Sequence, residues 1–483
     1  MFQIILPEKV KYILTKIEEH GFEAFAVGGC VRDSLLGRTP EDWDITTNAL
    51  PGQIKAIFPH TIDTGIEHGT VTVMLEREGF EVTTYRIDGE YEDSRHPSYV
   101  EFTSQLTEDL RRRDFTINAM AYSDTAGLVD VFGGQDDMNR RLIRCVGNPD
   151  ERFDEDALRI MRAVRFSAQL DFAIEPDTLR AVASHAGELA RISAERIRVE
   201  LTKLLLSAHP ERLLTAYETG LTAVFLPEFD VLLNTLQENP HHIYDVGNHT
   251  IHALMHCASL FAHAGQSAEI SSDSAPDDVP ILNKKEQTAL RYAILLHDIG
   301  KPSVKTYDKE GTAHFYRHQS IGAQMSKQIL RRLKFDNDTI HTVSHLIEYH
   351  DYRYSDSCSA TTERIMRRTI NRIGKEYLDL LFLLQEADLC AQNPEGMPDK
   401  LAQLARAKEI AHEILARKQC VCLKDLAVNG SDLIREGFLP GREIGDILQS
   451  LLEHVLEHPE DNQKEILLAR AKKHLQSCNS LLK

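Results

Sequence analysis

The chain has 483 residues, of which 42% are hydrophobic and 27% charged, so it can bury several cores and form about three domains. Its formal net charge of -19 argues against a uniformly basic, nucleic-acid-binding surface but leaves room for local basic faces such as Arg111–Arg113. A run of about 18 apolar residues is absent, which predicts no membrane-spanning helix.

Cysteine usage indicates a reducing compartment. The eight cysteines are scattered without a C-x-x-C pair, and the two-residue spacing of Cys420 and Cys422 is not typical of zinc sites. Residues Met1–Pro7 lack a basic segment followed by a long apolar one. We therefore expect free thiols, no membrane partner and a cytoplasmic location.

Strand and helix patterns are mixed only in the first part of the chain. Ala24–Val27 and Val71–Met74 are short apolar runs typical of strands. From about residue 150 the apolar residues recur at helical spacing, as in Leu158, Met161 and Val164. The pattern predicts an α/β head followed by a long all-α body, interrupted by a polar loop at Gly265–Asp278.

The first strand leads into a glycine pair that could hold a phosphate. Gly28 and Gly29 let the backbone approach a ligand closely, and a helix is expected at Val31–Leu36. Backbone amides at a helix start favour anions, and Arg32 could add a charge-assisted hydrogen bond. A tight strand-to-helix turn without a ligand is the alternative interpretation.

Two aspartates follow this turn. Asp42 and Asp44 flank Trp43, so in an extended segment their carboxylates share one face. Carboxylates so placed repel each other unless a cation lies between them, and oxygen ligands together with substrate phosphates suit Mg²⁺. The pair is typical of two-metal nucleotidyl transfer, although a solvated acidic turn gives the same pattern.

These motifs together resemble a known family. GGCVRDSLLG at Gly28–Gly37, followed by Asp42–Asp44, is similar to the motif of class II tRNA nucleotidyltransferases and bacterial poly(A) polymerases, which belong to the polymerase-β-like superfamily. The resemblance implies a polymerase-β-like nucleotidyltransferase head in which Asp42 and Asp44 are catalytic and bind Mg²⁺. Glu81 is a candidate third carboxylate, with a surface strand position as the alternative.

A second family motif lies at Arg112–Ala119, which resembles RRDFTxNA. The resemblance implies that Asp114 reads a ribose hydroxyl and that Arg113 and Asn118 seat the nucleotide beside Gly28, Gly29 and Arg32. A carboxylate that accepts from the 2′-hydroxyl would distinguish ribonucleotides from deoxyribonucleotides. An aspartate at this place is also typical of a helix cap.

The next motif resembles the nucleotide-selecting EDxxR of the family. Within Glu155–Arg159, an acceptor on Asp156 beside a donor on Arg159 would match the pairing edges of cytosine and adenine and refuse uracil and guanine. Arg162 and Arg165 follow on the same expected helix and are included among the nucleotide-binding residues. Surface salt bridges along a helix that begins at Glu155 are the alternative.

Three features favour CCA addition over poly(A) synthesis. Tyr91–Phe102 resembles the flexible loop of full CCA-adding enzymes, the C-terminus is not strongly basic, and Leu426–Gly430 with Leu439–Gly445 resembles a tail motif of these enzymes. The expected activity is addition of CCA to tRNA from CTP and ATP. A bacterial poly(A) polymerase is the alternative.

The body holds an ordered series of histidines and aspartates. His249, His297, Asp298 and Asp388 resemble the ligands of HD-type metal-dependent phosphohydrolases, and imidazole with carboxylate suits a second divalent metal. His318, His345 and His350 lie between these positions without an assigned role. The set implies hydrolysis of phosphomonoesters or cyclic phosphates, and a chain that is mainly such a hydrolase is a further alternative.

The patterns divide the chain into four expected domains. They are a nucleotidyltransferase head at 1–145, a helical neck at 146–240 that selects the nucleotide and binds RNA, an HD-type helical domain at 241–395 and a helical, tRNA-binding tail at 396–483.

Overall fold

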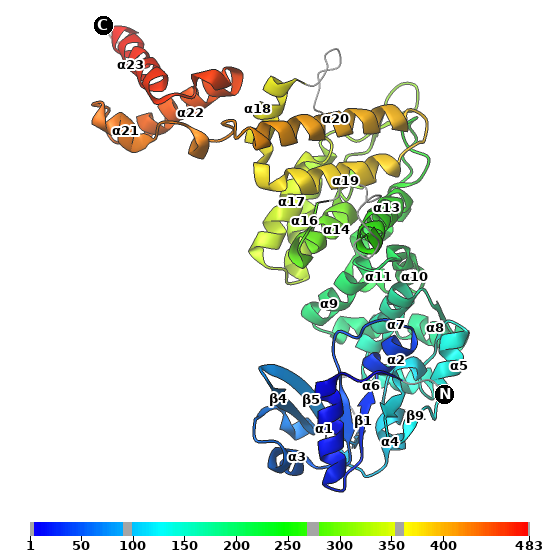
Figure 1. Cartoon of the computed structure of the whole chain (residues 1–483). Helices are drawn as coiled ribbons and strands as arrows, with labels where there is room; N and C mark the ends of the chain where they lie inside the picture. The colour runs from blue at the N-terminus through cyan, green and yellow to red at the C-terminus, as the bar shows by residue number, and fades with distance from the viewer. Residues whose placement is uncertain (1–3, 90–98, 268–279, 353–361, 482–483) are drawn as a thin grey trace. The chain divides into compact units, whose positions relative to one another are not determined.

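The computed structural model describes residues 4–89, 99–267, 280–352 and 362–481 (Figure 1). The chain folds as two compact units, one made of Met1–Asp230 with Arg332–Lys334 and the other of Val231–Arg331 with Phe335–Lys483. Each unit has its own interior.

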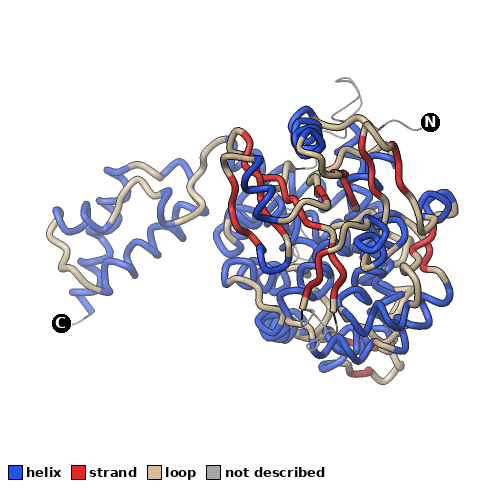
Figure 2. The backbone as a smooth tube through the Cα atoms, turned by 90° about the horizontal axis from the view of Figure 1, so that it is seen from below, coloured by secondary structure: helices blue, strands red, loops and turns tan. Residues whose placement is uncertain are grey.

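A mixed sheet forms the centre of the first unit. Within the described residues it has seven strands in the order β3-β4-β5-β2-β1-β8-β9, in which only β2 and β5 pair parallel. The strands, drawn in red in Figure 2, are β1 (Ala24–Val27), β2 (Ile45–Thr47), β3 (Thr61–Gly65), β4 (Thr70–Leu75), β5 (Glu78–Thr84), β8 (Ala121–Ser123) and β9 (Gly127–Val129). A separate ribbon joins β6 (Arg86–Asp88) to β7 (Val100–Phe102).

Burial explains why β1 and β2 lie inside the sheet. All four residues of β1 and all three of β2 are buried, whereas β4 alternates between buried and partly exposed residues. A core cluster that includes Phe25, Tyr85 and Leu110 adds to the interior of this unit. The buried inner strands therefore give the loops at their ends a rigid support.

Short helices surround the sheet, and longer ones follow it. They are α1 (Glu8–Glu19), α2 (Gly29–Leu35), α3 (Pro51–Ile57), α4 (Leu106–Arg111), α5 (Gly134–Asn139), α6 (Pro149–Glu155), α7 (Leu158–Leu170), α8 (Pro176–Ser184), α9 (Ala194–Leu205), α10 (Leu213–Glu218), α11 (Thr222–Phe225) and α12 (Pro227–Leu233). Helix α7 is buried on most sides and packs against α9. A short parallel pair joins β10 (Leu142–Ile143), which precedes α6, to β11 (Ala173–Ile174), which follows α7.

The second unit is almost wholly helical. Its helices are α13 (Val246–Ser267), α14 (Lys284–Leu296), α15 (Lys301–Val304), α16 (His318–Arg332), α17 (Asn337–Tyr349), α18 (Glu363–Ile373), α19 (Leu378–Cys390), α20 (Met397–Ala416), α21 (Gly430–Arg435), α22 (Arg442–Glu457) and α23 (Lys464–Leu481). A β-hairpin joins β12 (Thr306–Tyr307) to β13 (Ala313–His314). Helix α19 is apolar nearly all round because it lies between α13, α14 and α20.

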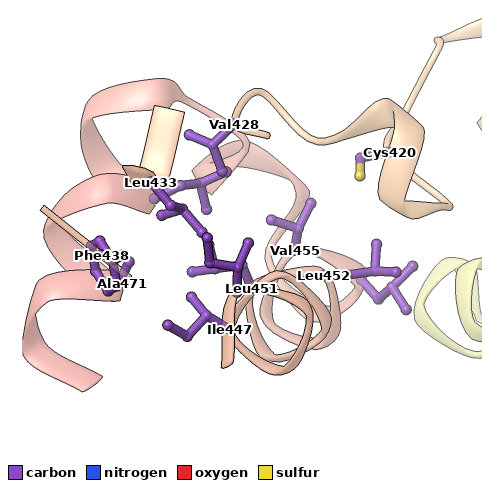
Figure 3. Packing of buried hydrophobic residues seen from close by; sticks show 12 residues of the cluster. Cys420, Val428, Leu433, Phe438, Ile447, Leu451, Leu452, Val455 and Ala471 are labelled. Carbon is purple, nitrogen blue, oxygen red and sulfur yellow. The ribbon is translucent and has the colours of Figure 1, made fainter. Parts of the chain in front are cut away.

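The last helices have a core of their own. Val428, Leu433, Phe438, Leu451 and Val455 are among its buried residues, contributed by α21, α22 and the segments that precede each of them (Figure 3). Asn429 caps α21 by accepting from the Asp432 amide, and Gly441 precedes α22 with φ 154°. The glycine-rich tail motif therefore supplies helix ends in this structure.

The expected arrangement of an α/β head followed by a largely helical body is confirmed. The strand expected at Ala24–Val27 coincides with β1. The polar loop expected at Gly265–Asp278 begins within α13, which extends to Ser267, and its remainder lies outside the described residues. Most of the loop expected at Tyr91–Phe102 also lies outside them.

Candidate active site

The turn after β1 requires a glycine. Gly28 has φ 84°, and a Cβ on it would lie 2.8 Å from Nη1 of Arg113. Gly29 then begins α2. The bare backbone of Gly28 lets the Arg113 guanidinium lie against the turn, so the glycine pair and one arginine of the second motif form one surface.

Three carboxylates meet beside this turn. Asp42 and Asp44 lie just before β2. β2 and β5 run parallel, and Ile45 is paired with Val82. Asp44 and Glu81, which come one residue earlier in each segment, are therefore neighbours. Although Asp44 and Glu81 are exposed, partial loss of solvation raises the pKa of each. Asp42 adds to the rise for Asp44 and Arg113 opposes it, and Asp44 and Asp42 both add to the rise for Glu81. The three groups repel one another, which a bound cation would relieve.

A chain of hydrogen bonds links α2 to the second motif. Arg32 donates from Nη1 to Oδ1 of Asn118 at 2.6 Å, and Asn118 donates from Nδ2 to Oδ1 of Asp114 at 3.0 Å. The Phe115 amide also donates to that oxygen of Asp114, at 2.8 Å. The motif residues are therefore interlocked. Asp114 is not the cap of the following turn, Thr116–Asn118, because Phe115 occupies the N-cap position without a side-chain cap hydrogen bond.

Arg162 completes the network from α7. Its Nε donates to Oδ2 of Asp114 at 2.8 Å. Although burial favours the protonated acid, Arg162, Asn118 and Arg159 hold the pKa of Asp114 well below its usual range. Asp114 is thus an anion, and each of its two carboxylate oxygens accepts a hydrogen bond from this network.

Phe166 is a functional candidate that sequence reasoning missed. The guanidinium carbons of Arg165, Arg32 and Arg162 lie 3.5, 5.0 and 5.2 Å from the centre of its ring. Arg165 also donates from Nε to Glu200 at 2.7 Å. The signal in the sequence was a single aromatic residue beside arginines at three-residue spacing. A ring in this place fixes the arginines by cation–π contact.

The selecting motif does not lie on one helix. α6 ends at Glu155, Asp156 has φ -141° and ψ 101°, and α7 begins at Leu158, so the continuous helix expected from Glu155 is wrong. Asp156 accepts from the amide of Leu158 at 3.0 Å, which satisfies an amide of the α7 start and makes the break stable.

Asp156 and Arg159 are held apart by other partners. Arg196, on α9, donates to Oδ2 of Asp156 at 2.8 Å. Arg159 donates to the carbonyl of Arg112 at 2.8 Å and contacts Glu155 at 2.5 Å. The arginine is thereby directed at the backbone of the second motif, and Arg196 is a further candidate that the sequence did not identify.

The four expected HD-type ligands come together in the second unit. His249 on α13 lies 2.9 Å from Asp388 on α19, measured from Nε2 to Oδ1. His297, directly after α14, has its Nε2 3.3 Å from Nε2 of His249 and 3.2 Å from Oδ2 of Asp298. His249, His297 and Asp298 are 0%, 1% and 1% exposed, so this is an interior group rather than a solvated surface.

The charges in this group are strongly coupled. Burial lowers the pKa of His297, but Asp298 and Asp388 outweigh it and raise that pKa to about 10. Burial would favour protonated Asp298, yet His297 and Lys301 hold its pKa well below the usual range. A cation among these side chains, whether a proton or a metal ion, is what the buried Asp298 and the half-buried Asp388 require.

His318 and His350 were not assigned a role from the sequence, yet they form a second group with Asp298. Their ring nitrogens lie within reach of one metal ion, as do those of His249 and His297 with Asp388. His345 lies elsewhere and its Nε2 donates to the carbonyl of Ile373 at 2.5 Å. The spacing of histidines along the chain could not separate the ligands from this one.

No helix among the described residues is both long and apolar enough to cross a membrane. The six cysteines whose side chains are described are all free thiols, and they are Cys30, Cys145, Cys257, Cys390, Cys420 and Cys422.

Three family models match successive parts of the chain. "Poly A polymerase head domain" matches residues 24–144, "Probable RNA and SrmB- binding site of polymerase A" matches 171–233, and "tRNA nucleotidyltransferase domain 2" matches 308–471. The first match contains the glycine turn and the carboxylates, and the third contains His318, His350 and Asp388.

Curated relatives cover the chain in part and in full. The CCA-adding enzyme of Limosilactobacillus reuteri (strain DSM 20016) is 53% identical over 203 residues, which are 42% of this chain and 50% of that protein. This chain thus matches only half of the length of that relative. The CCA-adding enzyme of Limosilactobacillus fermentum is 35% identical over 465 residues, 96% of each chain.

Solved structures are similar over nearly the whole chain. The structure of the Bacillus stearothermophilus CCA-adding enzyme in complex with CTP covers 99% of this chain and 100% of that one, at 28% identity and a TM-score of 0.67. The Thermotoga maritima CCA-adding enzyme complexed with tRNA is 21% identical with a TM-score of 0.57, which shows a shared fold.

Proposed function

This chain belongs to the family of CCA-adding enzymes, and on that premise we propose that it adds CCA to the 3′ end of tRNA from CTP and ATP, without a nucleic-acid template. The near full-length identity to the L. fermentum enzyme is the observation that carries the proposal. The B. stearothermophilus relative binds CTP, and the T. maritima protein of the same fold binds tRNA. A bacterial poly(A) polymerase is the second candidate, favoured by the matches at 24–144 and 171–233.

The reaction is nucleotidyl transfer. The 3′-hydroxyl oxygen of the RNA forms a bond to the α-phosphorus of the nucleotide, the bond from that phosphorus to the bridging oxygen breaks, and pyrophosphate leaves while the hydroxyl loses its proton. Gly28, Gly29 and Arg32 lie where they could receive the triphosphate, and Arg113 packs against the same turn.

The carboxylates of Asp42 and Asp44 fit Mg²⁺. Both belong to a group of mutually repelling anions at the end of β2, beside a turn suited to phosphates. Mg²⁺ held there supplies positive charge that favours the ionised hydroxyl and offsets the charge of the triphosphate. Glu81 shares the same electrostatic environment, so we propose it as the third carboxylate.

Nucleotide choice is assigned to Asp156 and Arg159. Asp114 and Asn118 hold the sugar, while Arg162 and Arg165 fix that site to α7. In the ligand-free arrangement Arg159 contacts Glu155 and a backbone carbonyl, and Asp156 contacts Arg196. A bound base would replace these contacts. With uracil or guanine, the polar groups of Asp156 and Arg159 would be left without matching partners.

A second activity is proposed for the helical unit. The convergence of His249, His297, Asp298 and Asp388 favours a metal site for hydrolysis of phosphomonoesters or cyclic phosphates. We assign the head to 1–145, the neck to 146–240, this HD-type domain to 241–395 and the tRNA-binding tail to 396–483. We also propose a cytoplasmic location, which suits the free thiols.

The test is incubation of the purified chain with tRNA that lacks CCA, together with Mg²⁺, CTP and ATP, followed by sequencing of the products. Growth by CCA and then arrest is expected. Asp42→Ala should abolish growth, whereas Asp63→Ala, an exposed aspartate on β3 that pairs with Lys55, should not. A run of A would instead establish a poly(A) polymerase, and no growth with any RNA would refute nucleotidyl transfer.

A further inference from the structure

Asp109 is a buried carboxylate of the head that no step proposed above uses. It lies on α4 and is 0% exposed, so neighbouring groups rather than water must offset its charge. Its Oδ1 accepts from Nε and Nη2 of Arg112 at 3.0 and 2.8 Å. Its Oδ2 accepts from Oγ1 of Thr46 at 3.1 Å and lies 3.7 Å from Nη2 of Arg113. Asp109 therefore connects β2 to the first two residues of the second motif.

The carboxyl of Asp109 is ionised. Although burial favours the protonated acid, Arg112 and Arg113 hold its pKa below the usual value. The hydroxyl of Thr46 also lies 3.2 Å from the carbonyl oxygen of Thr83, but it has one hydrogen and bonds more strongly to the charged acceptor. The anion thus holds a residue of β2 with one oxygen and an arginine with the other.

Thr46 belongs to the strand that follows the carboxylates assigned to Mg²⁺. β2 begins one residue after Asp44, whose carbonyl accepts from the amide of Val27 at 3.0 Å and so continues the pairing with β1. Residues two apart in an extended segment share a face, so Asp44 and Thr46 point to the same side. Asp109, which is bonded to Thr46, therefore lies on the side of β2 to which Asp44 points.

Arg113 lies between Asp109 and the glycine turn. A Cβ on Gly28 would come 2.8 Å from Nη1 of Arg113, while Nη2 faces Asp109. The Nε atom is buried and has no hydrogen-bond partner among the described residues. Burial lowers the pKa of this guanidinium, and Asp109 opposes the effect more than Asp44 does. Asp109 is thus the main counter-charge of Arg113, and Asp44 is a second one.

The position of Arg113 matters for what Asp44 can bind. The charge of Arg113 opposes the rise in the pKa of Asp44, so the two groups already interact. Full pairing with Arg113 would occupy carboxylate oxygens that Mg²⁺ needs and would withdraw the guanidinium from a bound triphosphate. The negative charge of Asp109 competes with Asp44 for Arg113 and prevents that pairing.

Arg112 gives Asp109 a second, structural role. The two hydrogen bonds between these side chains close the end of α4, where Arg112 is the C-cap residue. The carbonyl of Arg112 accepts from Nη2 of Arg159 at 2.8 Å. Loss of Asp109 will therefore lower stability as well, and a test of positioning must separate the two effects.

We propose that Asp109 is a positioning residue for nucleotidyl transfer, which keeps Arg113 beside Gly28 and leaves Asp44 free to bind Mg²⁺. The proposal rests on the nucleotidyl transfer proposed above and adds a residue that touches neither the nucleotide nor the ion. Because Asp109 acts through Arg113, its effect on binding of the ion depends on the presence of that arginine.

The test is the Mg²⁺ dependence of CTP addition to tRNA that lacks CCA. Asp109→Asn keeps the size of the side chain and removes its charge, so Arg113 should pair with Asp44. The Mg²⁺ concentration for half-maximal rate should rise about fivefold or more, and the KM for CTP should rise with it. If Asp109→Asn does not fold, Asp109→Ser also lacks the charge, leaves room for water beside Arg112, and should show the same rise.

A double-mutant cycle with Arg113→Gln separates positioning from stability. In Arg113→Gln the competing cation is absent, so addition of Asp109→Asn should change the Mg²⁺ requirement by less than about twofold. An equal shift with and without Arg113 would overturn the proposal, because Asp109 would then act through its own charge or through the fold.

Asp137→Asn is the matched control. Asp137 is 3% exposed and, like Asp109, accepts from a threonine and an arginine. The donors are Oγ1 of Thr116 at 2.5 Å and Nε of Arg144 at 2.9 Å. This variant should lose a similar amount of stability in urea titrations but keep the Mg²⁺ requirement of the parent chain. The same shift in the Asp109 and Asp137 variants would indicate damage to the fold and overturn the proposal.

Nucleotide binding measures the same effect without the reaction. Equilibrium dialysis of radiolabelled CTP over a range of Mg²⁺ concentrations gives the affinity of each variant for CTP. If the parent chain binds CTP but extends no RNA, the proposed CCA addition fails, and the same cycle applied to CTP affinity still decides the role of Asp109. No binding of CTP to the parent chain at any Mg²⁺ concentration would overturn both proposals.

Discussion

Arg162, on helix α7, and Asp114, in the second motif, form an ion pair in which the carboxylate is buried. Nε of Arg162 donates to Oδ2 of Asp114 at 2.8 Å, and Nη2 lies 2.6 Å from the same oxygen. Because Asp114 is only 7% exposed, removal of its negative charge leaves the surrounding donors without a charged acceptor. Asp114, which we propose to hold the sugar, is thus joined directly to the helix that carries Phe166.

Asp114→Asn should lower the free energy of unfolding by about 2 kcal/mol at pH 7, since hydrogen bonds to charged groups contribute about 1.5–3 kcal/mol. The pKa of Asp114 is lowered in the folded protein, so its contribution is complete above the unfolded value of about 3.9 and is lost as the pH falls through the folded value. Urea titrations should therefore show a constant difference in the free energy of unfolding between Asp114→Asn and the parent protein from pH 8 to about 5. This difference should narrow below about pH 4. Asp63→Asn, at an exposed ion pair, should change little, and an equal loss in both variants would contradict the assignment.

Gly28→Ala should abolish most nucleotide binding because its Cβ would displace the guanidinium of Arg113. Gly37→Ala is the matched control, since Gly37 has a similar φ of 71° but open space around its Cβ. Both variants should lose about 1 kcal/mol of stability from backbone strain. Only Gly28→Ala should raise the KM for CTP and ATP, by about tenfold or more. Equal KM values in both variants would show that Arg113 does not need the bare turn.

Asp44→Asn should slightly stabilise the metal-free protein at pH 7 because partial loss of solvation and Asp42 raise the pKa of this carboxyl. With a raised folded pKa, the charged form costs stability as the pH rises through that value, and the cost is absent below the unfolded value of about 3.9. With Mg²⁺ present, the parent protein should be more stable than Asp44→Asn, since the ion stabilises only a protein that binds it. Thermal unfolding with and without Mg²⁺ measures this difference, and equal stabilisation of both proteins would exclude Asp44 as a ligand.

Glu81→Gln should reduce kcat about 10–100-fold and raise the Mg²⁺ concentration needed for half-maximal rate. The reason is that Glu81 lies beside Asp44 across the β2–β5 pair and its pKa is raised by both aspartates. Glu78→Gln, at the start of the same strand and paired with Lys9, is the control and should retain activity. If the two variants have the same kcat and Mg²⁺ dependence, Glu81 is a surface strand residue.

Arg196→Ala should weaken selection of CTP and ATP over UTP and GTP, because Arg196 positions Asp156 from α9. We expect kcat/KM for CTP to fall about tenfold, with a smaller change for UTP, and Arg196→Lys to restore part of the selectivity. Arg191→Ala, at an exposed pair with Glu188, should leave both values unchanged. Equal losses for all four nucleotides would indicate a structural rather than a positioning role.

The motifs of the head could be identified from the sequence because each depends on local geometry. A glycine that must adopt φ 84°, an aspartate pair directly before a buried strand and an apolar run at Ala24–Val27 each depend on near neighbours in the chain. The fold class and the family followed from these residues. The break between α6 and α7 was missed because acidic and basic residues at helical spacing are also typical of a continuous helix.

Contacts between distant residues were decided only by tertiary structure. The partner of Asp156 is forty positions away on α9, and the ring of Phe166 collects arginines from both the head and the neck. His318 and His350 differ from His345 only in where their helices place them around Asp298. The sequence by itself thus determined the chemistry available, as ligand types in order along the chain. Packing of α13, α14, α16, α17 and α19 decided which of those ligands meet, because convergence depends on helix ends that no local pattern encodes.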